Sequence, residues 1–548
     1  MNLPAIARAT TLAGLAILLF ACSTGFDTRP EDLGTLPEDY GVVVVQATNN
    51  IDELNYRLFT WTGAHVARID QPDNHFLLKP AGTGLLGSRI FVGALPPGRY
   101  RIQNLISEWP ETGNPQAWME APVTENLGTF RIEPGQLTSL GTVLFQPLGA
   151  VEENGRWRRV HTFVRYDDEE RFDRFMSVAT PDLYERLGER IHGWDLERNG
   201  NAREELAERV GEFAVGTEYH WLGGGEIAMT GPIGAVMLRE GPGQWRRVET
   251  GVNHQLAAMA KTDDGYVVAG ERGLVMRADN LDGDWQVVTG PGSQSAVEWM
   301  TQMSNGSFYA LVRSGLTCTL FHVSEDFSEW TTKLLTSGRG GVFPLKCQLD
   351  VAAMNDDRIV LFGDGRRRIL DAAGEIVLDE ESDGFMSFEQ QPNGAGIAIP
   401  DPGWAISSVD HVYTFDGGES WHESSKDWPT ESDRVGEIGL LLVLPDHRAL
   451  ALSYKGYVDD FTKRVLYEDE PRLRMANEKG KIVRWGEKVE PYCRQLLPEI
   501  STEERIFARC SDGSLIVTED RGESWSEDFA PGGDGEEALD PADFEDAI

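Results

Sequence analysis

The sequence predicts a mainly β protein: a small β-sandwich, a short helical connector and then a β-propeller. Short runs of β-branched and aromatic residues, separated by turns rich in Gly and Pro, indicate strands in both β parts. From residue 215 onward, strand-like units recur about every 40–50 residues, which suits one four-stranded blade. A turn with the pattern Ser/Thr-x-Asp-x-Gly-x-x-Trp occurs at residues 414–421 and again at 518–525.

The propeller is expected over residues 215–530, with seven blades as the prediction and six or eight left open. Strand-like pieces end in a tryptophan five times, at Trp245, Trp285, Trp330, Trp421 and Trp525. The two longest gaps between these tryptophans each leave room for two units. We expect inner strands at residues 226–230, 265–270, 308–312, 358–363 and 449–452. A closed ring of blades leaves no long sheet edge exposed.

The repeated turn has a physical explanation. Its Asp carboxylate can accept hydrogen bonds from backbone N–H groups of the same turn, and its Gly can adopt a positive φ. Its Trp begins the next strand and can bury its ring between strands. We therefore interpret the turn residues as structural and not catalytic; they are Thr414, Asp416, Gly418 and Trp421 in the first copy and Thr518, Asp520, Gly522 and Trp525 in the second.

These turns resemble the Asp-box of BNR-like β-propellers, a group that includes sialidases, sortilin-type receptors and the photosystem II assembly factor family. The resemblance implies an architecture far more directly than an activity, because one fold hosts many functions. Two further turns have drifted from the pattern: residues 324–330 lack the Gly, and residues 278–285 form a longer turn.

Residues 40–148 are expected to form the β-sandwich. Residues 41–46 are rich in Val, as in a buried strand. The sequence Pro96-Pro97-Gly98 predicts a turn, after which Tyr100 and Ile102 alternate with arginines along a half-buried strand. This stretch resembles the prealbumin-like, carboxypeptidase-regulatory type of domain, and a binding or spacer role is the default interpretation.

Residues 149–214 interrupt the β pattern and are expected to form the connector. Helices are predicted at residues 181–191 and 202–210, with Asn201 as the N-cap of the second. The loop at residues 195–201 spaces its oxygen-bearing side chains like an EF-hand loop, but Leu206 occupies the twelfth position, where calcium needs a bidentate Glu. We interpret the loop as a capped turn, and no metal site is predicted.

The N-terminal residues indicate export. Residues 12–20 form an apolar run that is too short to span a bilayer and fits a secretory signal. The following motif, Leu19-Phe20-Ala21-Cys22, resembles a bacterial lipobox, although Phe20 is not the usual small residue. The resemblance implies that residues 1–21 are a lipoprotein signal peptide and that Cys22 becomes lipidated. Ser23 next to it implies anchoring at the outer membrane, facing the periplasm or the cell surface.

The formal net charge of the chain is −39 at pH 7. This charge argues against nucleic acid as a partner, because phosphate binding needs a basic face, and against adsorption to anionic lipid. We interpret it as a solubility feature, with a specific cationic partner as the alternative. Two polar segments have too little to bury, so residues 22–39 are expected to be a flexible tether and residues 531–548 a disordered acidic tail.

Four cysteines remain beyond Cys22, and an even number in an oxidising compartment favours disulfides. Four cysteines allow three pairings. We expect Cys318–Cys347 and Cys493–Cys510, because each pair lies within about one blade of sequence. The sequence contains no Cys-x-x-Cys spacing, which argues against a zinc site or a thioredoxin-like centre.

No catalytic or cofactor-binding residue can be assigned from the sequence. A sialidase site, as the family resemblance implies, needs an arginine cluster, a Tyr–Glu pair, an Asp acid and an early Arg-Ile-Pro signature, and that signature is absent. We interpret the three arginines at 366–368 as a solvated loop, and the paired acids at 356–357 and 503–504 as solvated turns. Four other tryptophans either pack in the core or stack on a ligand: Trp221, Trp299, Trp404 and Trp428.

The sequence favours a lipid-anchored, non-enzymatic bacterial envelope protein that binds a protein or glycan through its propeller, without a cofactor. Two alternatives stay open. One is a divergent glycosidase or lyase with its site at the central channel of the propeller, and the other is an assembly factor resembling the photosystem II type. Clustered Arg, Glu and Tyr at the channel mouth would favour an enzyme, whereas a broad apolar or charged patch on one rim would favour a partner protein.

Overall fold

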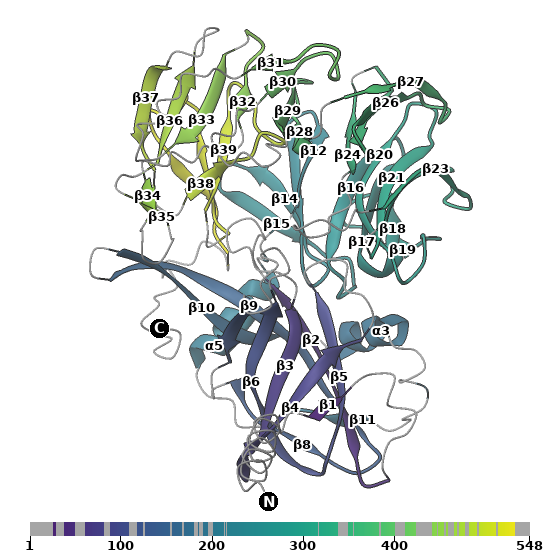
Figure 1. Ribbon diagram of the computed structural model, residues 1–548, viewed down its shortest axis with the longest axis vertical. Coiled ribbons are helices and arrows are strands. Elements are labelled where there is room, and N and C mark those ends of the chain that lie inside the picture. The colour runs from purple at the N-terminus through teal and green to yellow at the C-terminus, as the bar shows by residue number, and fades with distance from the viewer. Residues whose placement is uncertain are drawn as a thin grey trace, which may run out of the picture.

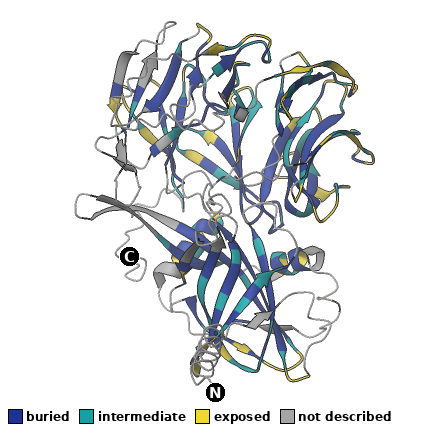
Figure 2. Cartoon of the chain, viewed as in Figure 1, coloured by how far each residue is buried: buried dark blue, intermediate teal, exposed yellow. Residues whose placement is uncertain are grey.

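A computed structural model describes residues 26–28 and most of residues 38–531; the longest interruptions are 50–60, 82–87, 109–117, 338–348, 401–411, 424–440 and 459–464. A curled β-domain (β1–β11) lies below a ring of four-stranded sheets (β12–β41) in Figure 1. Buried residues follow the centres of the strands in both parts, as the dark blue segments of Figure 2 show. The prediction of a mainly β fold with a propeller is confirmed.

The β-domain is one 11-stranded sheet in the order β10-β9-β2-β5-β4-β3-β6-β7, with β1, β8 and β11 attached to β4, β6 and β9. Its two halves enclose a common apolar core, as expected of a small sandwich. The strands are β1 (Phe26–Thr28), β2 (Gly41–Asn49), β3 (Trp61–Arg68), β4 (Gln71–Pro80), β5 (Arg89–Leu95), β6 (Gly98–Glu108), β7 (Trp118–Pro122), β8 (Phe130–Ile132), β9 (Leu137–Glu153), β10 (Arg156–Tyr166) and β11 (Arg190–His192).

The turn before β6 behaves as the sequence indicates. Tyr100 and Ile102 are buried, whereas Arg99 and Arg101 between and beside them are exposed or half-buried. The hydroxyl of Tyr100 donates to the carbonyl of Pro96 at 2.7 Å, which closes the turn from inside the domain. Burial of this side chain raises its pKa to about 12. Tyr100 therefore stays neutral and serves as a structural anchor.

The β pattern continues beyond residue 148, where we had expected the connector to begin. Strand β9 runs to Glu153 and pairs along its length with the antiparallel β10. The sequence hides this hairpin because β10 is rich in arginine, which is uncommon in isolated strand patterns. Figure 1 shows the end of the hairpin projecting from the domain.

Two helices cover the β-domain and reach towards the propeller. Helix α3 (Glu169–Ala179) packs Phe172, Phe175 and Met176 against the outer face of β2 and β5. Helix α5 (Asn201–Glu212) packs Leu206 and Val210 between β9, β10 and the first blade. Helix α5 begins at Asn201, in agreement with the prediction. The helix predicted at 181–191 falls mostly outside the described residues, and β11 takes its last positions.

Seven four-stranded sheets follow in the described part of the chain, so the predicted blade number is confirmed. They are blade 1, with β12 (Glu218–Gly223), β13 (Glu226–Thr230), β14 (Val236–Gly241) and β15 (Gln244–Val248); blade 2, with β16 (Leu256–Thr262), β17 (Gly265–Gly270), β18 (Val275–Ala278) and β19 (Gln286–Val287); blade 3, with β20 (Ala296–Gln302), β21 (Phe308–Ser314), β22 (Thr317–Val323) and β23 (Trp330–Ser337); blade 4, with β24 (Leu349–Ala353), β25 (Ile359–Gly363), β26 (Arg366–Leu370) and β27 (Ile376–Glu381); blade 5, with β28 (Phe385–Gln390), β29 (Gly396–Pro400), β30 (Val412–Thr414) and β31 (His422–Glu423); blade 6, with β32 (Leu442–Val443), β33 (Ala449–Ser453), β36 (Arg472–Ala476) and β37 (Ile482–Lys488); and blade 7, with β38 (Cys493–Leu496), β39 (Ile506–Cys510), β40 (Leu515–Thr518) and β41 (Ser526–Phe529).

The strands predicted as inner strands are the second strands of their blades. The first strands are the ones that contact one another between neighbouring blades, as β16 does with β12 and β20. We missed the first strands because several of them, such as β12 and β24, have few fully buried residues and carry a weak apolar signal. Blade 6 also carries a separate hairpin of β34 (Gly456–Val458) and β35 (Val465–Tyr467).

The disulfide Cys493–Cys510 joins the first two strands of blade 7, in which these residues are register partners. Cys318, on β22, is also disulfide-bonded. Its expected partner, Cys347, lies outside the described residues, so that pairing stays a prediction.

Candidate functional site

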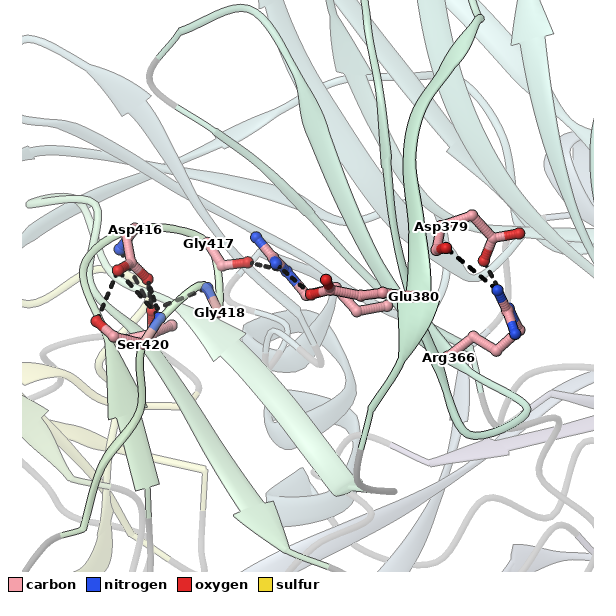
Figure 3. A network of polar contacts seen from close by, with 9 residues as sticks. Arg366, Asp379, Glu380, Asp416, Gly417, Gly418 and Ser420 are labelled. Atoms are coloured by element: carbon pink, nitrogen blue, oxygen red, sulfur yellow. Dashed lines mark hydrogen bonds and ion pairs between the residues drawn. The ribbon is translucent and has the colours of Figure 1, made fainter.

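The two repeated turns join the third strand of a blade to its fourth, in blades 5 and 7. In blade 5, the Thr414 hydroxyl donates to Asp416 at 2.6 Å and accepts from the Gly418 amide at 2.8 Å. The Asp416 carboxylate also accepts from the amide and the hydroxyl of Ser420, at 2.9 and 2.6 Å. Figure 3 shows this network. The Thr414 hydroxyl, the Asp416 carboxylate and the Ser420 hydroxyl therefore all have partners within the turn, and Gly418 has φ +85°.

Blade 7 repeats the arrangement with Thr518, Asp520, Gly522 and Ser524 at nearly the same distances. Hydrogen bonds, led by the one from the Ser524 hydroxyl, lower the pKa of Asp520 to about 2. In Asp416, partial burial raises the pKa, but the bonds from Ser420 and Thr414 outweigh it and hold the pKa below its ordinary value. Both carboxylates are thus ionised acceptors at neutral pH.

The drifted turn of blade 3 keeps the same chemistry without the glycine. Asp326 accepts from the hydroxyls of Ser324 and Ser328, both at 2.7 Å, and from the Ser328 amide at 3.0 Å. Phe327 takes the positive φ of 61° and buries its ring against Phe308. The position directly after the Asp has a positive φ in all three turns, at Gly417, Arg521 and Phe327, so it tolerates a side chain, and Phe327 places its ring in the core.

Replacing Asp416 with alanine is expected to lower the free energy of unfolding by about 1–2 kcal/mol, because the amide and hydroxyl of Ser420 lose a charged acceptor. Thermal unfolding followed by tryptophan fluorescence measures the effect. The control is Glu419→Ala, an exposed neighbour in the same turn. Equal melting temperatures for the two variants would show that the hydrogen bonds to Asp416 do not stabilise the turn.

Arg367 fastens the blade 5 turn to blade 4. Its guanidinium donates to the Gly417 carbonyl at 2.8 Å and to Glu380 at 2.7 Å, and its side chain is 3% exposed. On the other face of β26, Arg366 and Arg368 share Asp379, at 2.6 and 3.2 Å; Figure 3 shows the contact with Arg366. Our interpretation of 366–368 as a solvated loop is therefore wrong. The arginines lie on a strand, alternate between its faces and are held by β27, so they form no joint clamp for a ligand carboxylate.

The turn at residues 371–375 fastens blade 4 to blade 3. The carbonyl of Ala372 accepts from Asn305 Nδ2 at 2.8 Å and contacts His322 Nε2 at 3.2 Å. The carbonyl of Asp371 accepts from the Tyr309 hydroxyl at 2.6 Å. Within the turn, the Asp371 carboxylate accepts two backbone amides. The turn is therefore a rigid support for strand β27, which follows it.

Asn393 in blade 5 and Asn305 in blade 3 occupy equivalent positions and make equivalent hydrogen bonds to the next blade. Each Asn follows the first strand of its blade, accepts an amide two residues on, and donates to a carbonyl of the next blade, Val443 in the case of Asn393. We did not identify these residues from the sequence. The Asn-Gly pairs at 305–306 and 393–394 are typical of turns, so the turns could have been predicted from them. The contacts between blades could not.

The ring closes through a buried ion pair between its first and last blades. Arg239 on β14 binds Asp528 on β41 through two parallel hydrogen bonds of 2.8 and 2.7 Å. The indole of Trp245 donates to the same carboxylate at 3.0 Å, and the Gly243 amide does so at 3.2 Å. Phe529 packs edge-on against Trp245. No strand of the described chain is exchanged between the two blades, so this contact and the shared core close the ring.

A buried polar network joins the β-domain to the propeller. Asn253, in the loop between blades 1 and 2, donates to Gln46 Oε1 at 2.6 Å and contacts the Thr142 hydroxyl at 2.9 Å. The Thr142 hydroxyl donates to the same Gln46 oxygen at 2.8 Å, and Gln46 Nε2 reaches Ser88 at 3.0 Å. Gln46, Thr142 and Asn253 are at most 1% exposed. Such a network fixes the two parts in one relative orientation.

Next to this network, an aromatic contact continues the junction. The ring of Phe175 on α3 lies edge-on to His254 with centroids 4.8 Å apart, and the guanidinium of Arg272 covers the other part of Phe175. Arg272 belongs to the short helix η4 (Glu271–Gly273), whose buried Glu271 accepts the Gln255 amide at 2.7 Å. Burial raises the pKa of Glu271. Burial and the nearby Arg272 lower the pKa of His254 from 6.5 to about 3.

His254 makes the junction sensitive to acid. The unfolded chain takes up a proton on this imidazole below about pH 6.5, whereas the folded one resists it down to about pH 3. Stability is therefore lost as the pH falls through this window, by up to about 1.4 kcal/mol per pH unit. Melting temperatures measured at pH 7 and at pH 4 test this. The melting temperature of wild type should fall further between these pH values than that of His254→Leu. An equal fall in the melting temperature of the two proteins would contradict the role of His254, because all other titratable groups are present in both.

The remaining residues singled out by the sequence are distributed as follows. Trp221 and Trp299 are half-buried and pack against the cores between blades, which favours packing over ligand stacking. Cys22, Trp404 and Trp428 lie outside the described residues, as do residues 532–548. Asp195, of the EF-hand-like loop, is bound by Arg99 and Thr129. Among the described residues, no group of acidic, His or Cys side chains is arranged to hold a metal, and no helix could cross a membrane.

The outermost strands of three consecutive blades carry exposed apolar side chains. Among the described residues with large hydrophobic side chains, five are exposed, and four of these are Val287 on β19, Leu335 on β23, and Ile376 and Val377 on β27. Their exposed fractions are 66%, 62%, 48% and 52%. We call these four residues the outer rim; β19, β23 and β27 lie along one side of the propeller in Figure 1.

Solved structures offer the following comparisons. YCF48 bound to a D1 peptide is 12% identical to this chain with a TM-score of 0.35, over 57% of this chain and 88% of that one. BamB from Moraxella catarrhalis is 13% identical with a TM-score of 0.31, over 56% and 93%. A protein from Lactobacillus plantarum is 10% identical with a TM-score of 0.36, over 55% and 93%. No known family model and no curated protein matches the sequence.

Proposed function

We propose that this chain is a lipid-anchored protein of the bacterial envelope whose propeller is a non-enzymatic platform for binding or assembling a partner protein. The outer rim is the observation that supports a protein partner: four large apolar side chains remain in water on the outermost strands of three adjacent blades. The rigid junction and the ties between blades give this platform a fixed shape. The BNR-like character of the repeated turns belongs to the same proposal, and so does anchoring through Cys22.

The test of the platform is a pull-down of the intact, tagged protein from its native envelope, with partners identified by mass spectrometry. We expect the same partner in stoichiometric amount from wild type and from Ile69→Ser, which removes an exposed apolar side chain of the β-domain. A variant with Leu335→Ser and Ile376→Ser should lose it. Recovery of no stoichiometric partner, or measurable hydrolysis of aryl glycosides by the purified protein, would refute the proposal.

The lipid anchor is tested separately by metabolic labelling with an alkyne-bearing palmitate. We expect wild type to carry the label and to fractionate with membranes, and Cys22→Ser to lose both properties. A Cys22→Ser variant that is still labelled would refute anchoring at this residue and leave the platform untouched.

A further inference from the structure

Strand β1 ties the N-terminal segment to the β-domain. It lies within residues 22–39, for which the composition predicts a flexible tether. Its three residues pair in parallel with residues 76–78 of β4. Strand β3 occupies the opposite edge of β4 at these residues, and among the described residues β5 pairs with β4 only at Lys79 and Pro80. Strand β1 therefore fills the edge of β4 that β5 leaves open, where backbone groups need hydrogen-bond partners.

The direction of β1 decides at which end of the domain the chain enters. Because β1 is parallel to β4, its first residue lies beside Phe76, towards the turn that joins β3 to β4. In this turn the amide of Ile69 donates to the carbonyl of Arg99, at the start of β6, at 2.9 Å. The start of β6 pairs in turn with the end of β8. We call this end of the β-domain the distal end; it is formed by the turns at residues 69–70, 96–97 and 133–136.

The propeller lies at the other end of the same strands. Strand β2 begins at the distal end, where Gly41 pairs with Leu95, and reaches Gln46, which belongs to the network that joins the propeller. Figure 1 likewise shows β8 and the propeller at opposite ends of the β-domain. The eleven-residue strand β6 can rise up to about 35 Å between these ends. The β-domain is thus a spacer between the distal end and the propeller.

Little chain separates the proposed lipid anchor from the distal end. Cys22 precedes Phe26 by four residues, which span at most about 14 Å even when fully extended. A lipid on Cys22 therefore holds the distal end within that distance of the membrane. Without β1 the tether would run to Gly41, 19 positions from Cys22, and a flexible chain of that length would let the β-domain turn freely.

The distal end also carries an exposed apolar side chain. Among the described residues, Ile69 is the large exposed hydrophobic residue that does not belong to the outer rim, and it is 41% exposed. Charges of both signs surround it: Arg68 pairs with Asp70 at 2.7 Å, and Arg131 and Glu133 are both exposed near the end of β8. An apolar side chain among charges of both signs suits the headgroup region of a bilayer, which repels the strongly acidic chain as a whole.

We propose that the distal end rests on the lipid surface, that β1 holds it there, and that the propeller is thereby kept away from the membrane. The inference rests on the proposed anchor at Cys22 and adds the orientation of the platform to it. Ile69 enters the headgroup region. The outer rim and the rest of the propeller are then open to a partner protein in the aqueous phase.

The test uses the full lipidated protein in vesicles of phosphatidylcholine and phosphatidylethanolamine. Some of the phosphatidylcholine carries a doxyl quencher on its acyl chain next to the headgroup. A bimane fluorophore is attached at Asp70→Cys in the distal end or at Val377→Cys on β27 of the propeller, both exposed positions. Bimane at residue 70 should be quenched at least about twofold, and bimane at residue 377 should not be quenched. Wild type treated with the same reagent gives the background from its own cysteines.

Two matched insertions test the role of β1. A segment of about ten Gly and Ser residues is placed either before β1, between Gly25 and Phe26, or after it, between Thr28 and Arg29. The insertion before β1 lengthens the link between lipid and domain, so quenching at residue 70 should fall at least about twofold. The insertion after β1 leaves that link unchanged, and quenching should stay at the level of wild type. Ile69→Ser should also weaken quenching, because an apolar contact with lipid is lost.

Several outcomes would overturn the inference. Equal quenching in the two insertion variants would show that β1 does not hold the domain at the membrane. Quenching at residue 377 as strong as at residue 70 would mean that the propeller also lies on the lipid. Undiminished quenching in Ile69→Ser would exclude Ile69 from the contact.

The anchor itself is read separately, from the palmitate label and from flotation of the protein with the vesicles. A protein that is labelled and floats but is not quenched at residue 70 would refute the orientation and leave the anchor standing. A protein that neither carries the label nor floats would refute the anchor, and the inference with it.

Discussion

Replacing Asp528 with alanine is expected to lower the free energy of unfolding of the propeller by about 3–5 kcal/mol, the cost of leaving one partner of a buried pair uncompensated. The Arg239 guanidinium, 4% exposed, would lose both of its hydrogen bonds to the carboxylate. The Trp245 indole and the Gly243 amide would lose their acceptor as well. Urea denaturation followed by tryptophan fluorescence measures the loss.

The matched control is Glu240→Ala on the same strand. Glu240 also binds an arginine, Arg246, but that pair is exposed to solvent, so its removal should cost no more than about 1 kcal/mol. A double variant with Arg239→Met and Asp528→Leu should regain part of the stability, because it leaves no buried charge. Similar losses for Asp528→Ala and Glu240→Ala would show that the ring closes by apolar packing alone.

Replacing Asn253 with leucine is expected to cost about 2–3 kcal/mol and to uncouple the β-domain from the propeller. Gln46 and Thr142 would keep their buried polar atoms but lose the amide that bridges them, and each unsatisfied group carries a desolvation penalty. Differential scanning calorimetry should show one cooperative transition in wild type and two in the variant. Small-angle scattering should show a broader distribution of distances.

The control for this substitution is Asn74→Leu, which alters an exposed Asn of the β-domain whose side chain donates to Gln71. It should leave the single transition in place. One transition in Asn253→Leu with an unchanged midpoint would mean that the apolar contacts of α5 and α3 hold the junction without the network.

The two experiments distinguish the contact that closes the propeller ring from the contact that joins the β-domain to the propeller. Asp528 tests the closure of the ring, which involves an ion pair between residues at least 283 positions apart in the sequence. Asn253 tests the junction, which involves neutral amides. Only the junction carries the acid-sensitive His254, so a loss of coupling at low pH in wild type should resemble the effect of Asn253→Leu at neutral pH.

Local chemistry was enough to predict much of the propeller. The glycines at both ends of β17 and the apolar residues between them defined its bounds, residues 265–270, without any knowledge of neighbours. Residues 414–421 and 518–525 contain nearly all of the partners of their own hydrogen bonds, so their turns could be anticipated residue by residue. The β9–β10 hairpin was missed because its arginine-rich second strand has no local apolar pattern.

The sequence by itself predicted a β protein of two parts, a propeller of seven blades with six or eight left open, the position of the turns and the pairing of Cys493 with Cys510, because each depends on residues close together in the chain. Only the tertiary structure decided the closure by Arg239 and Asp528, the junction through Gln46 and Asn253, and the support of Arg367 for the blade 5 turn. These contacts join residues from 50 to 289 positions apart. A periodic pattern reports which face of a strand is buried, but it does not report which distant strand covers that face.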